Sequence, residues 1–222
     1  MEKYDKFWIG FGDIHGDPGN AARIPDIAKA EGVIISGDIT THGSKDAAMR
    51  VVDAVRRLNP ALYVQIGNMD NASVTGWLEE EGLNIHAQVR ELAPGVGLVG
   101  VGCSSPTPFG TPCELPDAQL GELLDLAMGE AKPWPALLLV AHDPPYGTLA
   151  DMAGGQHVGS HAVRSFVDRV QPDVCLCGHI HESRALDFVG KTAVVNPGML
   201  AQGGYVVIGL AGKSLTVKLR TL

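Results

Sequence analysis

The chain has 222 residues, of which 45% are hydrophobic and 19% are charged, a composition typical of a globular protein. Its 25 acidic residues outnumber its 17 basic residues and give a formal net charge of -8. Because a basic surface normally supplies the affinity for polyanions, long nucleic acids are disfavoured as partners. Bound cations can still neutralise a small anionic substrate at a local site. We expect a single domain over residues 1–222.

Cysteine usage and the lack of long apolar segments indicate a cytoplasmic protein. Cys175 and Cys177 lie two residues apart in an apolar run and would share one face of a strand, a poor geometry for a mutual disulfide. Since Cys103 and Cys113 form no CxxC pair either, we expect all cysteines to be reduced. Residues 1–6 are charged and lack the apolar core of a secretion signal. No apolar run approaches the ~20 residues that span a bilayer, so no membrane association is expected.

Apolar runs and amphipathic stretches alternate along the chain. The runs predict strands, and the stretches with apolar residues three and four positions apart predict helices. In chain order, we expect strands at 7–11 and 33–36, a helix at 44–58, strands at 62–66 and 96–101, a helix at 115–128, a strand at 136–141, a helix at 161–170, and strands at 174–177, 192–195 and 205–210. Ser44 is a candidate N-cap of the first helix, and Pro116 stands at the start of the second.

Beyond residue 183 the pattern changes to strands joined by glycine-bearing turns. These turns lie at 190–191, 203–204 and 212–213, and they predict an antiparallel meander that closes the fold. Alternating strands and helices followed by a strand-rich tail favour a layered α/β sandwich with one mixed sheet or two facing sheets.

Five short segments that contain metal-ligand residue types each follow an apolar run. They are GDIHG at 12–16, GD at 37–38, GNMD at 67–70, AHD at 141–143 and GHIH at 178–181. A residue just beyond the carboxyl end of a strand points into the crevice above the sheet, so segments that are distant in sequence can converge there. We expect the glycines to let the backbone turn sharply at these points.

The converging side chains offer two carboxylates, one amide oxygen and four imidazoles, from Asp13, Asp38, Asn68, His15, His142, His179 and His181. Seven donors are too many for one four-coordinate metal ion, but they suit two ions if one carboxylate is shared. Mixed nitrogen and oxygen donors without a thiolate favour two divalent ions, with manganese expected and iron, zinc or nickel as alternatives.

In this order, the five segments resemble those of the calcineurin-like metallophosphoesterases. The resemblance spans residues 12–181, and Asn196-Pro197-Gly198 is similar to a segment of small bacterial and archaeal phosphodiesterases of the family. It implies a four-layer α/β/β/α sandwich with mixed sheets. It also implies the following ligands: Asp13, His15, Asp38 and His181 for one metal ion, and Asp38, Asn68, His142 and His179 for the other.

The activity implied by this resemblance is hydrolysis of a phosphate ester by attack of a metal-bridging hydroxide, without a covalent enzyme intermediate. Asp38, Asn68 and His142 would then be catalytic as well as metal-binding. The expected substrate is a small phosphate ester, and a homodimer is an open possibility for the assembly. Two alternatives remain: a phosphomonoesterase, including a protein phosphatase, and a non-catalytic protein-binding scaffold of the same fold.

Met69 departs from the family pattern. Many members carry a histidine at this place, where it faces the leaving-group oxygen, whereas a thioether cannot donate a proton. General-acid assistance worth about 10²-fold to 10⁴-fold is therefore missing there. This favours a phosphodiester with a good leaving group, or a substitute acid. We take His157, in a glycine-rich stretch, as the candidate catalytic acid, with Asp143 and Asp151 as less favoured choices.

Two further residues are candidates for substrate binding. Tyr146 follows His142 closely enough to wall the pocket, although it is also a simple rim aromatic, and His42 follows the second segment on what is otherwise a surface loop. Asp70, without its usual histidine partner, is expected to cap the following turn with Asn71 or Ser73.

Overall fold

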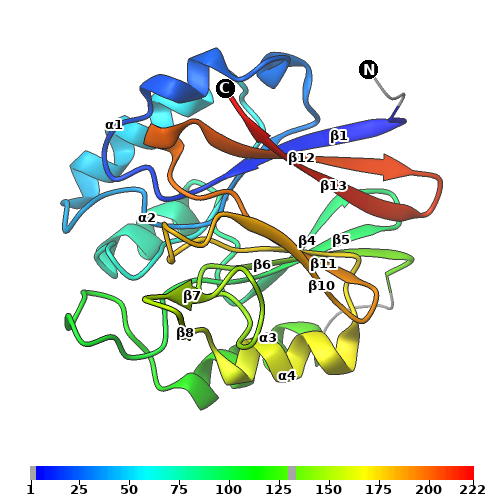
Figure 1. Cartoon of the computed structure of the whole chain (residues 1–222). Coiled ribbons are helices and arrows are strands. Elements are labelled where there is room, and N and C mark those ends of the chain that lie inside the picture. The colour runs from blue at the N-terminus through cyan, green and yellow to red at the C-terminus, as the bar shows by residue number, and fades with distance from the viewer. Residues whose placement is uncertain (1–3, 130–133) are drawn as a thin grey trace.

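Two mixed β-sheets lie face to face and carry helices on their outer faces (Figure 1). The computed structural model describes residues 4–129 and 134–222, so the first three residues of the charged N-terminal segment lie outside it. The four-layer α/β/β/α sandwich predicted from the sequence is confirmed. Among the described residues, no helix combines the length and apolarity that crossing a membrane requires.

The first sheet has the strand order β13-β12-β1-β2-β3. Parallel strands β1, β2 and β3 form one side, and β12 and β13 form an antiparallel hairpin beside β1. Ile9 at the centre of β1 is in register with Val33 of β2 and Val207 of β12. The strands are β1 (Lys6–Phe11), β2 (Val33–Ile35), β3 (Leu62–Val64), β12 (Gly204–Ala211) and β13 (Ser214–Thr221).

The second sheet has the order β10-β11-β9-β6-β5-β4. Its four central strands are parallel, and the edge strands β10 and β4 are antiparallel to their neighbours. The strands are β4 (Gln88–Ala93), β5 (Val96–Val101), β6 (Ala136–Ala141), β9 (Val174–Leu176), β10 (Ala185–Val189) and β11 (Thr192–Asn196). A separate small hairpin joins β7 (Met152–Ala153) and β8 (Gln156–His157).

Helices α1 (Lys45–Arg56) and α2 (Ser73–Glu80) cover the first sheet, and α3 (Asp117–Gly129) and α4 (His161–Val170) cover the second. Ser44 caps α1 as predicted, since its Oγ accepts a hydrogen bond from the Ala47 backbone at 3.3 Å. Ser160 caps α4 in the same way. Three short 3-10 turns are η1 (Gly19–Arg23), η2 (Ile27–Lys29) and η3 (Leu200–Gln202).

The core has a layer on each side of each sheet. Along β1, Trp8 faces the space between the sheets, whereas Ile9 faces the α1 side. Along β6, Leu138 lies between the sheets and Leu139 packs toward α3 and α4. Because both faces of these strands are buried, their sequences are nearly continuous apolar runs, which is why the runs predict the strands so well.

The eight predicted strands and three predicted helices are confirmed. The runs do not predict β4, β7, β8 or α2, because β4 contains no continuous apolar run and the other three are short. The predicted closing meander is wrong. The hairpins β10-β11 and β12-β13 belong to different sheets, and the connection at 203–204 carries the chain from one sheet to the other.

The expectation that all cysteines are reduced is also wrong, because Cys103 and Cys113 form a disulfide. Their backbone N–H groups donate to carbonyls two positions apart in one segment, Cys103 N to Ile66 O at 3.3 Å and Cys113 N to Asn68 O at 2.9 Å. This shared docking brings the two thiols together across ten positions of sequence. Cys175 and Cys177 are free and buried, as expected for strand residues of the core.

Candidate metal centre

The five predicted segments meet at one edge of the sandwich. Those that follow β1, β2 and β3 come from the first sheet, and those that follow β6 and β9 come from the second. Within each sheet these strands are parallel, so their carboxyl ends lie side by side and aim the following residues into a common crevice. All seven predicted ligand side chains reach this place.

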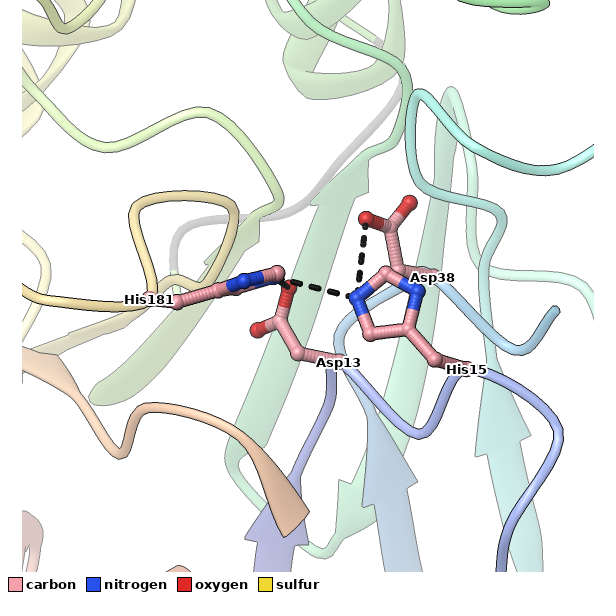
Figure 2. A group of neighbouring side chains, drawn as sticks. All are labelled: Asp13, His15, Asp38 and His181. Atoms are coloured by element: carbon pink, nitrogen blue, oxygen red, sulfur yellow. Dashed lines mark hydrogen bonds and ion pairs between the residues drawn. The ribbon is translucent and has the colours of Figure 1, made fainter. Parts of the chain in front are cut away.

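One cluster consists of Asp13, His15, Asp38 and His181 (Figure 2). One ligand atom from each residue lies within 4.8 Å of the others. His15 Nε2 is 3.0 Å from His181 Nε2 and 3.7 Å from Asp38 Oδ2, and His181 Nε2 is 3.2 Å from Asp13 Oδ1. These four residues form a possible site for a metal ion.

The chemistry of this cluster fits a cation. Asp13 is fully buried, and its Oδ2 has no hydrogen-bond partner among the described residues. A buried carboxylate oxygen without a partner is costly, and a divalent ion beside Asp13 Oδ2 would provide the missing partner. The two imidazole nitrogens, which lie 3.0 Å apart, are close enough to bind the same ion in place of a hydrogen bond between them.

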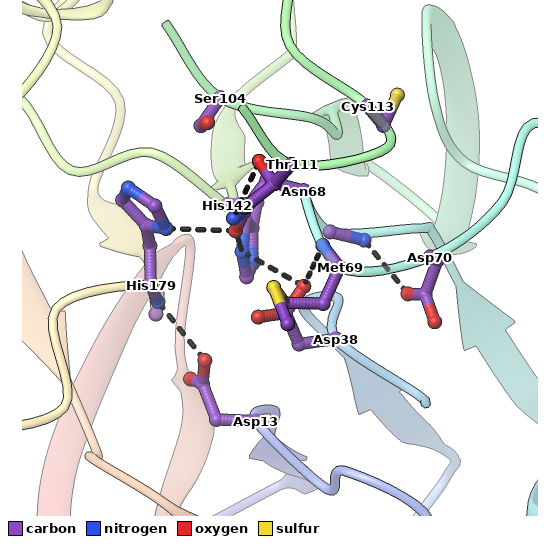
Figure 3. A network of polar contacts seen from close by, with 12 residues as sticks. Asp13, Asp38, Asn68, Met69, Asp70, Ser104, Thr111, Cys113, His142 and His179 are labelled. Carbon is purple, nitrogen blue, oxygen red and sulfur yellow. Dashed lines mark hydrogen bonds and ion pairs between the residues drawn. The ribbon is translucent and has the colours of Figure 1, made fainter. Parts of the chain in front are cut away.

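A second cluster surrounds the Asn68 amide oxygen (Figure 3). His142 Nε2 lies 2.9 Å and His179 Nδ1 2.8 Å from Asn68 Oδ1, and His142 Nε2 is 3.3 Å from Asp38 Oδ1. Asp38 thus faces the first cluster with Oδ2 and the second with Oδ1. This arrangement agrees with the expectation that Asp38 is the shared carboxylate.

Contacts outside the clusters orient two of the imidazoles. His142 Nδ1 lies 3.1 Å from Ser36 O, and since a carbonyl only accepts, Nδ1 carries a proton. Nε2 is therefore the nitrogen that faces Asn68 Oδ1 and Asp38 Oδ1, where it can bind a metal ion once its own proton is displaced. His15 Nδ1 lies 3.0 Å from Thr41 Oγ1. The sequence gives no signal for Ser36 or Thr41, because neither is a metal-ligand residue type in this pattern.

Four predicted ligands adopt a left-handed backbone conformation. The φ angles are 48° at Asp13, 49° at His15, 49° at Asp38 and 68° at His179. Such conformations cost about 1–3 kcal/mol each in a residue with a Cβ, and they persist only where the surroundings hold them. Their concentration at one place marks it as a site rather than an ordinary loop cluster.

At two glycines of the predicted segments there is no room for a side chain, and this lack of room, rather than a sharp turn, requires glycine. A Cβ at Gly67 would lie 2.1 Å from Asp38 Oδ1, and a Cβ at Gly178 would lie 2.5 Å from Asp13 Oδ2. Any side chain at these positions would displace a carboxylate of the clusters.

Asp70 has a different role from the predicted turn cap. It is buried and accepts hydrogen bonds from the backbone of Gly67 at 3.0 Å, of Ile39 at 2.9 Å and of Thr40 at 2.8 Å, and from Thr40 Oγ1 at 2.9 Å. Burial and the Asp38 charge raise the pKa of Asp70 to about 6, although these donors oppose the shift. Asp70 therefore ties the loop that carries Asp38 to the loop that carries Asn68.

Asn196 anchors the GHIH segment in a similar way. Its Nδ2 donates to the carbonyls of Gly178 at 3.2 Å and Ile180 at 2.9 Å, and its Oδ1 accepts from Gly198 N at 2.8 Å. The Asn-Pro-Gly segment is thus a support for the loop that carries His179 and His181.

The remaining candidates lie outside the two clusters. His157 Nδ1 is 2.8 Å from Asp151 Oδ1, and the His157 side chain is 39% exposed. Tyr146 stacks on His161 with ring centroids 3.9 Å apart, and His42 is exposed, with its backbone N–H donating to Met69 O at 3.0 Å. Within the described residues, no polar contact joins these side chains to the clusters, so their roles stay predictions.

The less favoured acids are both engaged in the fold. Asp151 is buried and accepts from the backbone N–H groups of Gly147, Thr148 and Gly159. Asp143 is buried, and its Oδ2 accepts from the backbone and the hydroxyl of Ser105 at 2.8 and 2.6 Å. Burial raises the pKa of Asp143, although His179 and Ser105 oppose the shift.

We predict that Asp70→Asn destabilises the metal-free protein. The new amide would place two N–H donors where donors of Ile39, Thr40 and Gly67 already converge, so buried groups would lose their acceptors. The expected loss is about 2–3 kcal/mol in the free energy of unfolding, measured by urea denaturation. Asp168→Asn, at a side chain that is 53% exposed, is the control and should change stability by less than about 1 kcal/mol. Equal stability of the two variants would contradict this role for Asp70.

We also predict that metal binding strengthens as the pH rises. Burial lowers the pKa of His142, but the charges of Asp38, Asp13 and Asp70 outweigh it and raise the pKa to about 9, above the model-peptide value of 6.5. The proton on His142 therefore stabilises the metal-free fold below pH 6.5, and this contribution is lost as the pH rises toward 9. A metal ion must displace that proton.

Titration calorimetry with Mn²⁺ at about pH 6.5 and about pH 8, in buffers of different ionisation enthalpy, measures this competition. We expect tighter binding at the higher pH and a heat that depends on the buffer because protons are released. An affinity that does not change with pH, with no proton release, would show that metal binding displaces no proton from His142.

Comparisons with known proteins identify related sequences and a related fold. The family model for metallophosphoesterases of the calcineurin superfamily matches residues 124–220. The chain is 35% identical over 205 residues to the uncharacterized protein MJ1162 of Methanocaldococcus jannaschii, with 89% of each protein covered.

Solved structures of other proteins have a similar fold. TT1561 of Thermus thermophilus has a TM-score of 0.69 at 19% identity, with 96% of this chain and 98% of that chain covered. A dimetal phosphatase from Danio rerio has a TM-score of 0.67 at 12% identity, with 99% and 97% covered. The chain belongs to the calcineurin superfamily of metallophosphoesterases.

Proposed function

We propose that this protein is a phosphodiesterase that uses two divalent metal ions. The observation that carries the proposal is the position of Asp38, whose two carboxylate oxygens face separate clusters of ligand atoms, Oδ2 at 3.7 Å from His15 Nε2 and Oδ1 at 3.3 Å from His142 Nε2. A carboxylate shared in this way is the feature that makes seven donors sufficient for two ions.

The ligand sets that the geometry supports are Asp13, His15, Asp38 and His181 for the first ion, and Asp38, Asn68, His142 and His179 for the second. When bound, divalent ions would supply a Lewis acid for the phosphoryl oxygens and a water of lowered pKa. Manganese is our choice among the candidates, because the donors are a mixture of oxygen and imidazole nitrogen.

The charges of these ligands favour a small phosphate anion as substrate. The two clusters contain two carboxylates, and their other donors are neutral when they bind metal, so two divalent ions would leave an excess of positive charge in the site. The rest of the protein is strongly acidic, with a net charge of -8. A locally positive site on an acidic molecule suits a small ester better than a long nucleic acid.

The environment of Met69 favours a diester over a monoester. Its backbone N–H donates to Asp38 Oδ1 at 2.8 Å, so residue 69 lies directly beside the shared carboxylate. The thioether cannot protonate a leaving group from this place. Diesters with good leaving groups need this assistance least, which supports a phosphodiesterase.

His157 is our candidate for a substitute acid. Asp151 holds its Nδ1 at 2.8 Å, and Asp151 is itself fixed by three backbone N–H groups, so the imidazole is oriented from behind while the side chain stays 39% exposed. A protonated imidazole can donate a proton to a leaving-group oxygen. Tyr146, 5.6 Å from the His157 ring, and His42 are the proposed substrate-binding residues.

Hydrolysis of bis(p-nitrophenyl) phosphate and of p-nitrophenyl phosphate tests the proposal. We expect metal-stripped protein to gain diesterase activity on titration with Mn²⁺, and Asp38→Asn and His142→Ala to lose it by at least about 10²-fold. Asp168→Asn, at an exposed aspartate, should behave as wild type. In His157→Ala, we expect the alkaline arm of the pH–rate profile, where a general acid loses its proton, to move or disappear.

The outcomes separate the alternatives. Preference for the monoester would overturn the diester assignment and indicate a phosphomonoesterase. An unchanged pH–rate profile in His157→Ala would remove His157 as the acid. If two ions bind but neither ester is hydrolysed, the assignment of an enzymatic function would be overturned, and a protein-binding scaffold would be favoured.

A further inference from the structure

The loop between Cys103 and Cys113 is fixed beside Asn68. Both of its ends dock on the segment that carries Asn68, through Cys103 N to Ile66 O and Cys113 N to Asn68 O. Ser104 N donates to Cys113 O at 3.2 Å, and the disulfide closes the base of the loop. The side chains of this loop therefore have a defined position relative to the second cluster.

One of these side chains contacts the Asn68 amide. Asn68 Nδ2 donates to Thr111 Oγ1 at 3.0 Å, while Asn68 Oδ1 faces His142 and His179 (Figure 3). A carboxamide can present either its oxygen or its NH₂ group to a neighbour, and only the oxygen can bind a cation. The orientation of this amide therefore decides whether the second cluster has four ligands or three.

Glu114 determines whether the Thr111 hydroxyl donates or accepts a hydrogen bond in its contact with Asn68. Glu114 Oε1 accepts from Thr111 Oγ1 at 2.7 Å, from Thr111 N at 2.7 Å and from Thr107 Oγ1 at 2.6 Å. Burial raises the pKa of Glu114, but the Thr107 and Thr111 donors outweigh it and lower the pKa to about 2. The carboxylate can only accept, so the Thr111 hydroxyl proton is committed to it and Oγ1 turns a lone pair toward Asn68.

We propose that Thr111 is a positioning residue for the second metal ion: its hydroxyl, oriented by Glu114, holds Asn68 with Nδ2 outward and Oδ1 toward His142 and His179. This inference rests on the proposed two-metal site. Thr111 is not one of the proposed ligands, so it acts through Asn68, to which it is hydrogen-bonded. The sequence gives no signal for it, since it lies more than 40 residues from Asn68 in a loop without a metal-ligand pattern.

Three variants separate this role from a general effect on the loop. Thr111→Val keeps the shape but removes the acceptor, Thr111→Ser keeps the hydroxyl, and Thr107→Val removes a donor to Glu114 without contacting Asn68. Mn²⁺ binding is followed by calorimetry and electron paramagnetic resonance. Thermal unfolding of each metal-free variant shows whether it is folded.

We expect wild type to bind two ions, and Thr111→Val to bind the second about 10- to 100-fold more weakly with the first unchanged. Thr111→Ser and Thr107→Val should bind both nearly as wild type does. Equal second-ion affinity in Thr111→Val and wild type would overturn the positioning role and leave the proposed function intact. An equal loss in Thr107→Val would also overturn it, because the effect would then belong to the loop as a whole.

Failure of the proposed function looks different, since wild type itself would then bind fewer than two ions. If Thr111→Val does not fold, Glu114→Gln takes its place. Its amide can donate to Thr111 Oγ1 and compete with Asn68 for the lone pair, so weaker binding of the second ion alone is expected, and unchanged binding would overturn the proposal.

Discussion

The Asp38 carboxylate is the constraint on which the rest of the site depends. It is 2% exposed, and burial alone would raise its pKa, but the charge and hydrogen bond of His142 and the Met69 N–H outweigh this and lower it. A second buried carboxylate, Asp13, lies in the same crevice. Two buried negative charges require compensation, and the imidazoles around them can provide it only when they hold protons or a metal ion.

The polar groups around the clusters fix the loops that carry them. Asp70 joins the two loops of the first sheet, Asn196 holds the GHIH loop, and Ser36 orients His142. Asp70 and Asn196 make most of their contacts to backbone groups and so set the course of the chain, whereas the Ser36 carbonyl contacts the His142 side chain. Four candidate ligands in these loops adopt left-handed conformations, which persist only where such contacts hold them. The sheets direct the loops toward a common crevice, and these contacts fix the position of each loop there.

The strands and the convergence of the seven candidate ligands could be predicted from sequence for one physical reason. The parallel strands are buried on both faces, so their sequences are apolar runs, and the candidate ligands follow directly where each run ends. The assignment of hairpins to sheets could not be predicted. The sequence of a glycine-bearing turn such as 190–191 does not indicate whether the next strand belongs to the same sheet or to the other sheet.

The long-range polar contacts could not be predicted from the sequence either. Asp70 has partners 30 and 31 residues away, and the disulfide between Cys103 and Cys113 depends on both ends of a loop docking on residues 66–68. Thr111 meets Asn68 for the same reason. Such pairings follow from how the loops pack together, and neither periodicity nor residue type near the pairing positions signals them.

The electron paramagnetic resonance spectrum of Mn²⁺-titrated protein tests the shared role of Asp38 most directly. Two ions that share a carboxylate lie about 3.5–4 Å apart and couple magnetically. The account predicts two ions per wild-type chain with a coupled signal, and loss of that coupling in Asp38→Asn. A single ion, or two ions without coupling in the wild type, would contradict it.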